Sequence, residues 1–199
     1  MTLPGQPGGG PPRQLRPTDV KRLNRDWRRR TEGRLAVVLD SVAQPFNVGS
    51  IVRTSAAFGA EGLWLCGNTP DLEHPSVGKV ALGTERFLEV TREPSAPLAV
   101  KAAQAAGYLV VAVELATGAL PLAEAPLGGD ICLVIGNEDH GCSPAVLAAV
   151  DAVTYIPQPS RVGSLNAGVA AGIAMAEVRR REWHPAREGS ALSRPGDFD

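Results

Sequence analysis

The sequence predicts an α/β fold with a parallel sheet that helices cover on both faces. Runs of Val, Ile and Leu at 34–40, 108–114 and 131–135 have the length and apolar character of strands buried on both sides. Helical patterns alternate with these runs, and such alternation is typical of a parallel sheet. The 199 residues are enough for one domain with a substantial core.

The first half of the chain predicts helices over 18–30, 47–58 and 76–82, and strands over 34–40, 62–66 and 86–90. Thr18 and Asn47 are the expected N-caps of the first two helices, because their side chains can accept a hydrogen bond from a free backbone N–H. Gly59 follows the second helix and can end it in the left-handed conformation.

The second half predicts helices over 97–106, 144–150 and 164–181, and strands over 108–114, 131–135 and 153–156. Gly107 is the expected stop of the first of these helices, and Pro144 suits the first turn of the second. Ser164 is the expected cap of the last helix. That helix is unusually rich in Ala and Gly, so it should pack closely against the sheet or a partner subunit.

Composition divides the chain into four segments. We expect a disordered Gly/Pro tail over 1–12, a basic helix over 13–33, the α/β domain over 34–182 and a flexible tail over 183–199. No apolar run approaches the length of a membrane span, and the first residues lack the apolar core of a signal peptide. Cys66, Cys132 and Cys142 lack metal-ligand spacing, which favours free or buried thiols in the cytoplasm.

The net charge of −1 hides two basic regions. Segment 13–34 contains nine Arg or Lys residues and three acidic ones, and Arg179, Arg180 and Arg181 end the last helix. Charge runs are often only solvated faces. Two such regions, with Trp27 and Trp183 beside them, favour a polyanionic partner.

The first polar cluster begins at Asn47 and includes Arg53 on the same predicted helix. Capping alone could explain Asn47. Arg53 lies among mostly apolar or small residues, where an unpaired guanidinium would be costly. It therefore needs a carboxylate or a phosphate as partner, and Glu138 is the candidate carboxylate.

The second cluster, 136–141, reads Gly-Asn-Glu-Asp-His-Gly and directly follows the strand at 131–135. Its glycines permit a tight turn and a close approach of the backbone to a ligand. It has neither P-loop nor dinucleotide-binding spacing, which argues against a dinucleotide-dependent oxidoreductase. Adjacent acidic and His residues seldom converge on one ion, so no metal is expected.

The third cluster includes Ile156, Pro157, Ser164, Leu165 and Asn166. No nucleophile elbow surrounds Ser164, which argues against a serine hydrolase. Asn166 is a poor helix former inside a predicted first turn, so capping by Ser164 leaves its presence unexplained.

Together the three clusters resemble, in order and spacing, the signature motifs of the SpoU/TrmH family of RNA ribose 2′-O-methyltransferases, which belong to the SPOUT class. The resemblance covers about 34–181 and implies a deep C-terminal trefoil knot, bound S-adenosylmethionine and a homodimer. Gln158 departs from it, because many members carry methionine there.

The resemblance implies roles for particular residues. It implies that the catalytic residues are Arg53, Asn47, Glu138, Ser164 and Asn166, and that the cofactor-binding residues are Glu114, Gly136, Ile156, Ser164 and Leu165. The residues expected to contact RNA are Arg28, Arg29, Arg30 and Arg53. The compact chain favours tRNA as substrate, with the D-loop guanosine as the target. Ribosomal RNA is the alternative, wobble-position tRNA methylation comes third, and a non-catalytic RNA-binding protein on this fold is also retained.

Overall fold

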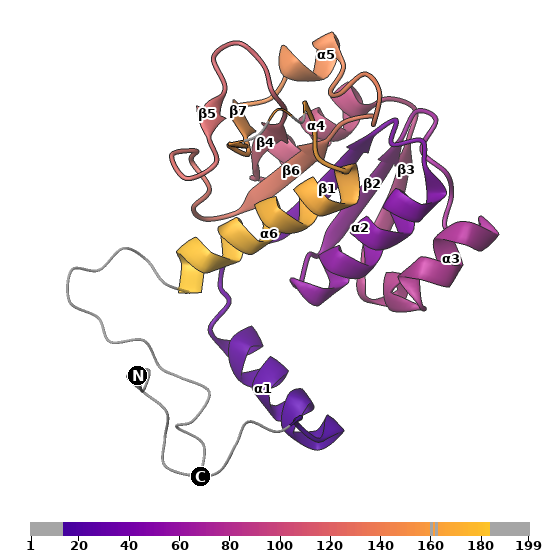
Figure 1. Ribbon diagram of the computed structural model, residues 1–199, viewed down its shortest axis with the longest axis vertical. Coiled ribbons are helices and arrows are strands. Elements are labelled where there is room, and N and C mark those ends of the chain that lie inside the picture. Colours follow the sequence, from indigo (N-terminus) through magenta and orange to yellow (C-terminus); the bar gives the residue numbers. More distant parts are fainter. Residues whose placement is uncertain (1–13, 160, 162, 184–199) are drawn as a thin grey trace.

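The structure is a computed structural model that describes residues 14–159, 161 and 163–183 (Figure 1). The expectations for the 1–12 tail and for nearly all of the 183–199 tail lie outside these residues. The α/β prediction is confirmed. A seven-stranded sheet has the order β3-β2-β1-β6-β4-β7-β5, and each pairing between its described strands is parallel.

The strands are β1 (Leu35–Asp40), β2 (Gly62–Cys66), β3 (Glu89–Glu93), β4 (Leu109–Val113), β5 (Leu120–Pro121), β6 (Ile131–Ile135) and β7 (Ala152–Tyr155). The helices are α1 (Pro17–Arg29), α2 (Pro45–Ala57), α3 (Pro75–Ala81), the 3₁₀ helix η1 (Thr84–Phe87), α4 (Ala96–Ala105), α5 (Pro144–Leu147) and α6 (Ala167–Trp183). The central strands β1 and β6 are entirely buried, as their continuous apolar runs predict.

Helices cover both faces of the sheet, as predicted. Leu35, Val37 and Leu39 of β1 pack with apolar residues of α2, α3 and α6. The alternate residues Ala36 and Val38 pack with α4 and α5 on the other face. This alternation places α2 and α6 side by side on one face of the sheet (Figure 1).

The small residues of α6 allow it to approach α2 closely. A Cβ atom at Gly168 would lie 3.2 Å from the Ser50 hydroxyl oxygen of α2, and one at Gly172 would lie 3.7 Å from a Thr54 methyl group. The expectation of close packing is therefore met within one chain, against a neighbouring helix as well as the sheet.

Several predicted boundaries were wrong. Thr18 and Asn47 are not N-caps, because α1 begins at Pro17 and α2 at Pro45, where proline suits the first turn. The strand predicted at 86–90 is replaced by η1 and then β3, whose register on β2 begins at Glu89. The two-residue β5 was not predicted. Gly59 and Gly107 end their helices with φ of 66° and 91°, as expected.

The second basic region is also different from the prediction. Arg179 is buried, and its guanidinium donates to the backbone carbonyls of Gly33, Phe58 and Gly59 and to Glu182. The contacts to Phe58 and Gly59 supply donors to carbonyl groups at the end of α2, which lack partners within the helix. Arg179 is therefore a structural cation and is not available to a polyanion.

The other two arginines of this region are also paired. Arg180 and Arg181 both donate to the Glu177 carboxylate, and Arg181 donates further to the Leu122 and Ala125 carbonyls. The region joins α6 to the loop after β5, so of the two basic regions only the one at α1 presents a cluster of exposed basic side chains.

The three cysteines are free and buried, as expected. Burial raises the pKa of the Cys66 thiol to about 12 and also raises the pKa of the Cys132 and Cys142 thiols. Among the described residues, no helix combines the length and the apolar character that a membrane span requires.

Candidate functional site

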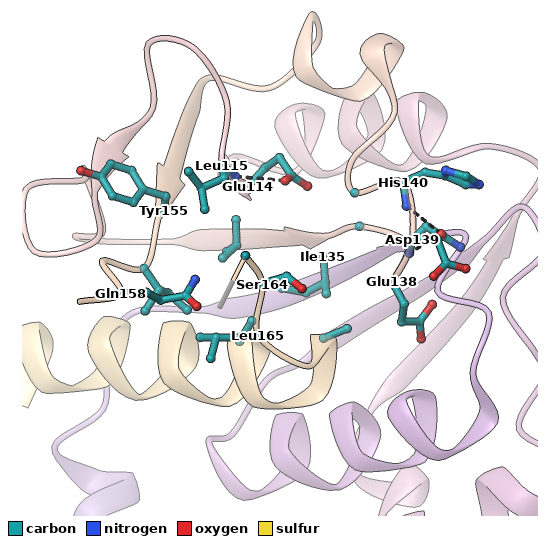
Figure 2. Close-up of a pocket in the computed structure, with 18 residues that line it drawn as sticks. Glu114, Leu115, Ile135, Glu138, Asp139, His140, Tyr155, Gln158, Ser164 and Leu165 are labelled. Carbon is teal, nitrogen blue, oxygen red and sulfur yellow. Dashed lines mark hydrogen bonds between the residues drawn. The ribbon is translucent and has the colours of Figure 1, made fainter. Parts of the chain in front are cut away.

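A cavity of about 360 Å³ lies at the carboxyl ends of β4, β6 and β7, where ligands bind in open parallel sheets (Figure 2). All five residues expected to bind a cofactor line it: Glu114, Gly136, Ile156, Ser164 and Leu165. Glu138 lines the same cavity, whereas Asn47, Arg53 and Asn166 do not. The second and third clusters therefore share one pocket.

The 136–141 loop is held by Asn137, a residue that sequence reasoning did not select. The backbones of Asn137 and Gly141 exchange two hydrogen bonds of 3.0 and 2.9 Å. The Asn137 amide donates to the Ser41 carbonyl and accepts from the N–H groups of Asp139 and His140. Its position directly after a buried strand was a signal that could have identified it.

The glycines of this loop are required by close contacts. A Cβ atom at Gly136 would lie 2.3 Å from the Cys142 nitrogen, and one at Gly141 would lie 2.3 Å from a Glu114 carboxylate oxygen. Gly141 also has a φ of 68°, which side-chain-bearing residues rarely adopt. Glu114 accepts from the Cys142 N–H at 2.7 Å, so its carboxylate joins the end of β4 to the loop after β6.

Asp40, at the carboxyl end of β1, is a further buried carboxylate that sequence reasoning missed. It accepts from the Ser143 N–H at 2.7 Å and so fixes the chain that follows the loop.

Glu138 connects the loop to the start of α2. One carboxylate oxygen accepts from the Asn47 amide at 2.7 Å and the Gln44 N–H at 3.1 Å, and the other accepts from the Ala43 N–H at 2.9 Å. Burial opposes ionisation of this carboxyl, but the hydrogen bonds from Asn47, Ala43 and Gln44 outweigh it and lower the pKa of Glu138. The carboxylate is therefore ionised at neutral pH.

The network continues from Asn47 to the third cluster. The Asn166 amide donates to the Asn47 carbonyl oxygen at 2.8 Å, and the Asn166 side-chain oxygen accepts from the Val169 N–H at 3.2 Å. Asn166 thus performs the capping role at α6 that was predicted for Ser164. Glu138, Asn47 and Asn166 join all three clusters beside the cavity.

Arg53 does not pair with Glu138, contrary to the prediction. Its side chain is exposed on α2, and no acceptor contacts it within the part of the chain that the structure describes. The sequence context was misleading because the apolar neighbours of Arg53 face the sheet, while Arg53 itself points away from it. The guanidinium is available to an anionic ligand.

The basic α1 helix lies against the C-terminal end of α6. The Trp27 and Trp183 rings lie 4.8 Å apart between centroids, and the Trp183 indole N–H donates to the Thr31 hydroxyl at 2.9 Å. Arg28, Arg29 and Arg30 are exposed at the end of α1. The cavity lies at the other end of α6, because Ala167 at the start of that helix lines it, whereas α1 lies near the C-terminal end of α6 (Figure 1). The described residues include no cluster of three or more His, Cys, Asp or Glu side chains suited to a metal ion.

Comparison with known proteins identifies a close group of relatives. The sequence profile of the SpoU rRNA methylase family matches residues 34–176. An uncharacterized tRNA/rRNA methyltransferase of Synechocystis sp. is 33% identical over 82% of this chain and 57% of its own length. The chain spans about half the length of the curated relatives that it matches.

Solved structures agree with this result. An AdoMet-bound rRNA methyltransferase of Sinorhizobium meliloti has a TM-score of 0.70 and 32% identity, over 76% of this chain and 57% of that one. A structure described as explaining 2-OH methylation of C/U34 on tRNA has a TM-score of 0.67 and 31% identity, over 75% of this chain and 96% of that one.

Proposed function

This chain belongs to the SpoU rRNA methylase family, and on that premise we propose that it transfers a methyl group from S-adenosylmethionine to a ribose 2′-hydroxyl of RNA. The observation that carries the proposal is the hydrogen-bonded chain from Glu138 through Asn47 to Asn166. It joins three separate motifs at the rim of one cavity and leaves Arg53 exposed on the connected helix. No redox or hydrolytic chemistry explains this combination as well.

The cavity fits S-adenosylmethionine. Its walls include backbone at Gly136 and Gly141, where an added Cβ atom would collide with neighbouring atoms. Such a wall suits a ligand that is recognised through backbone groups. Gly136, Ile156 and Leu165 would hold the cofactor, with Glu114 and Ser164 as polar contacts, and Gln158 lines the same wall. When bound, the cofactor supplies an electrophilic methyl group on a sulfonium.

The protein residues then have to position the ribose. We assign Arg53 to the RNA, where its planar guanidinium can hold a phosphate and a ribose oxygen together. A guanidinium stays protonated in proteins, so Arg53 orients the ribose and stabilises charge, while the bound phosphate accepts a hydrogen bond from the ribose hydroxyl, whose proton passes to solvent. Asn47, Glu138 and Asn166 fix α2 relative to the cavity and thereby fix Arg53.

We propose a homodimer as the active form. Val169 and Ile173, one helical turn apart on α6, are 51% and 38% exposed, and Phe46 on α2 is 64% exposed. Phe46 also precedes Arg53 by two helical turns on the same side of α2. This apolar surface supports an interface beside Arg53 and predicts a dimer in sedimentation experiments.

For the substrate we propose tRNA, with the D-loop guanosine as the target, and retain ribosomal RNA and the wobble position as alternatives. The similarity to a structure concerned with tRNA methylation, of which this chain covers 96%, supports tRNA. We also propose that the chain divides into a basic helix over 13–33 and a methyltransferase domain over 34–182. The proposal further includes a C-terminal trefoil knot and a cytoplasmic location. The knot rests on family membership.

Two measurements test the proposal. Calorimetry should show metal-independent binding of S-adenosylmethionine or its demethylated product. Mapping of 2′-O-methyl sites in RNA from a deletion strain should reveal one missing modification and so identify the substrate. Cofactor binding without any methyl transfer to cellular RNA would favour the non-catalytic RNA-binding alternative, and the absence of cofactor binding would contradict the proposal.

A further inference from the structure

A second cavity, of about 460 Å³, lies between α1 and the C-terminal ends of α2 and α6. Trp27, Arg28 and Thr31 line it from the α1 side, and Ala57, Glu61 and Trp183 line it from the domain. We call this cavity the tryptophan cleft. It lies at the opposite end of α6 from the cofactor cavity, because α6 begins beside that cavity at Ala167 and ends at Trp183 (Figure 1).

The tryptophan cleft has aromatic walls that are held in place. The two indole rings are only partly buried, and their planes are tilted by 42°. The Thr31 hydroxyl accepts from the Trp183 indole and donates to the Trp27 carbonyl, which fixes both residues relative to each other. No α1 residue is buried, so this contact leaves a cavity where a packed core could have formed.

The charges around the tryptophan cleft differ between its rim and its walls. Segment 16–30, which includes α1, carries seven Arg or Lys residues and two Asp residues. Glu32 and Glu61 line the cleft itself, and the Arg179 guanidinium in its wall is committed to carbonyls and to Glu182. Arg28 also contributes to the lining, but it is exposed and belongs with the other arginines at the rim, so a phosphate would be attracted to the rim and repelled by the carboxylates inside.

We propose that the tryptophan cleft binds an unstacked nucleobase of the RNA substrate, while the α1 arginines hold the flanking phosphates. A nucleobase is flat and uncharged, it stacks on aromatic rings, and its N–H groups can donate to carboxylates. This inference rests on the proposed function, because it takes the substrate to be RNA.

The position of Arg53 supports one continuous RNA path. Arg53 precedes Ala57 by four residues, so the two lie about one turn apart on the same side of α2. Both are exposed, and Ala57 lines the tryptophan cleft. An RNA strand with one base in the cleft therefore has its neighbouring phosphates within reach of Arg53.

The test uses the full chain and two short single-stranded RNAs that differ only by removal of the bases at central positions. Binding is measured by fluorescence anisotropy over a range of salt concentrations. The intact protein should bind the base-containing RNA at least about five-fold more tightly than the abasic one, since each stacked base contributes on this scale. Trp27→Ala should abolish the preference without changing the salt dependence, because no phosphate contact is lost.

Two further variants separate recognition from folding. Ala57→Leu fills the tryptophan cleft from an exposed position without removing a contact, and it should also abolish the preference. Lys21→Gln, on α1 but outside the cleft lining, should weaken binding of both RNAs equally and keep the preference.

The inference is overturned if both Trp27→Ala and Ala57→Leu still bind the base-containing RNA more tightly than the abasic RNA. It is also overturned if Ala57→Leu changes the oligomeric state but leaves RNA binding unchanged. If the wild-type protein binds RNA but shows no preference, the inference alone fails. If it binds neither RNA at any salt concentration, the proposed function fails with it.

Discussion

Asn166 donates a hydrogen bond to Asn47 at 2.8 Å, although 119 positions separate them in the sequence. These contacts fix the orientation of the Asn47 side-chain amide, since its oxygen accepts from Asn166 while its nitrogen donates to Glu138. Asn47 is buried, so losing either partner would leave a desolvated polar group. The start of α2, the start of α6 and the loop after β6 therefore hold one another in position.

Glu138→Gln should destabilise the protein by about 1–3 kcal/mol. The three donors around the carboxylate would then face an amide that can accept at only one end. Urea unfolding of the variant, compared with Asp139→Asn on the exposed side of the same loop, measures the effect. Equal stability of both variants would mean that the network contributes nothing.

Gly141→Ala should abolish cofactor binding and lower stability, because the new methyl group would overlap the Glu114 carboxylate and force an unfavourable φ. Gly163 lines the same cavity, and a Cβ atom there would meet no atom within 4 Å, so Gly163→Ala is the matched control. Calorimetry should show binding in the control only. Normal binding by Gly141→Ala would place the cofactor elsewhere.

Arg53→Ala should eliminate methyl transfer but leave the unfolding free energy unchanged and the affinity for the cofactor within about two-fold of wild type. The reason is that Arg53 is exposed and outside the cavity lining. Arg53→Lys should also be severely impaired, since lysine keeps the charge but loses the planar fork. Methyl transfer at a near wild-type rate by the lysine variant would show that charge alone suffices.

Neutralising Arg28, Arg29 and Arg30 should weaken RNA binding and flatten its salt dependence by about one unit for each lost phosphate contact. Deletion of residues 1–30 should likewise weaken RNA binding far more than cofactor binding. The corresponding control is Arg86→Gln, an exposed arginine in η1. An unchanged slope in the triple variant would remove α1 from the RNA site.

The stability of the protein should fall in acid partly through Glu177. Hydrogen bonds from Arg180 and Arg181 lower the pKa of Glu177 from 4.5 to about 2. Because the folded-state pKa is the lower one, this stabilisation is fully present above about pH 4.5 and is lost as the pH falls towards 2.

The difference in unfolding free energy between wild type and Glu177→Gln should therefore be about 1 kcal/mol at neutral pH and shrink below pH 4.5. If the difference in unfolding free energy does not depend on pH, the ion pairs of Glu177 with Arg180 and Arg181 do not contribute to stability. Glu124→Gln, on the exposed part of the loop after β5, is the control.

The sequence was sufficient to predict the parallel sheet, because β1 and β6 are buried on both faces and leave an unbroken apolar signal. It was less informative where the signal is short or local. The two residues of β5 are too few to show a periodic pattern. The residues around β3 mix charged and apolar side chains, so the sequence did not define where that strand begins. N-caps were misplaced where proline, without a side-chain acceptor, starts the helix.

Within the site, the sequence predicted which loops meet but not which side chains pair. Gly136, Ser164 and Leu165 line one cavity, because parallel strands bring their carboxyl ends to one edge. The partner of Glu138 could not be read from the sequence, because it depends on which side of α2 faces the loop. Arg179 was likewise assigned to the surface, since three consecutive arginines conceal the one that points inwards.

The burial of Arg179 has a consequence for synthesis of the protein on the ribosome. The carbonyl groups of Gly33, Phe58 and Gly59 receive their donor only when Arg179, which follows Phe58 by 121 positions, has emerged from the ribosome. Until then the part of this sheet face that α6 covers, beside α2 and α3, is exposed to solvent. A nascent chain that does not yet include Arg179 therefore cannot complete this fold, and a product that terminates before Arg179 is expected to be degraded.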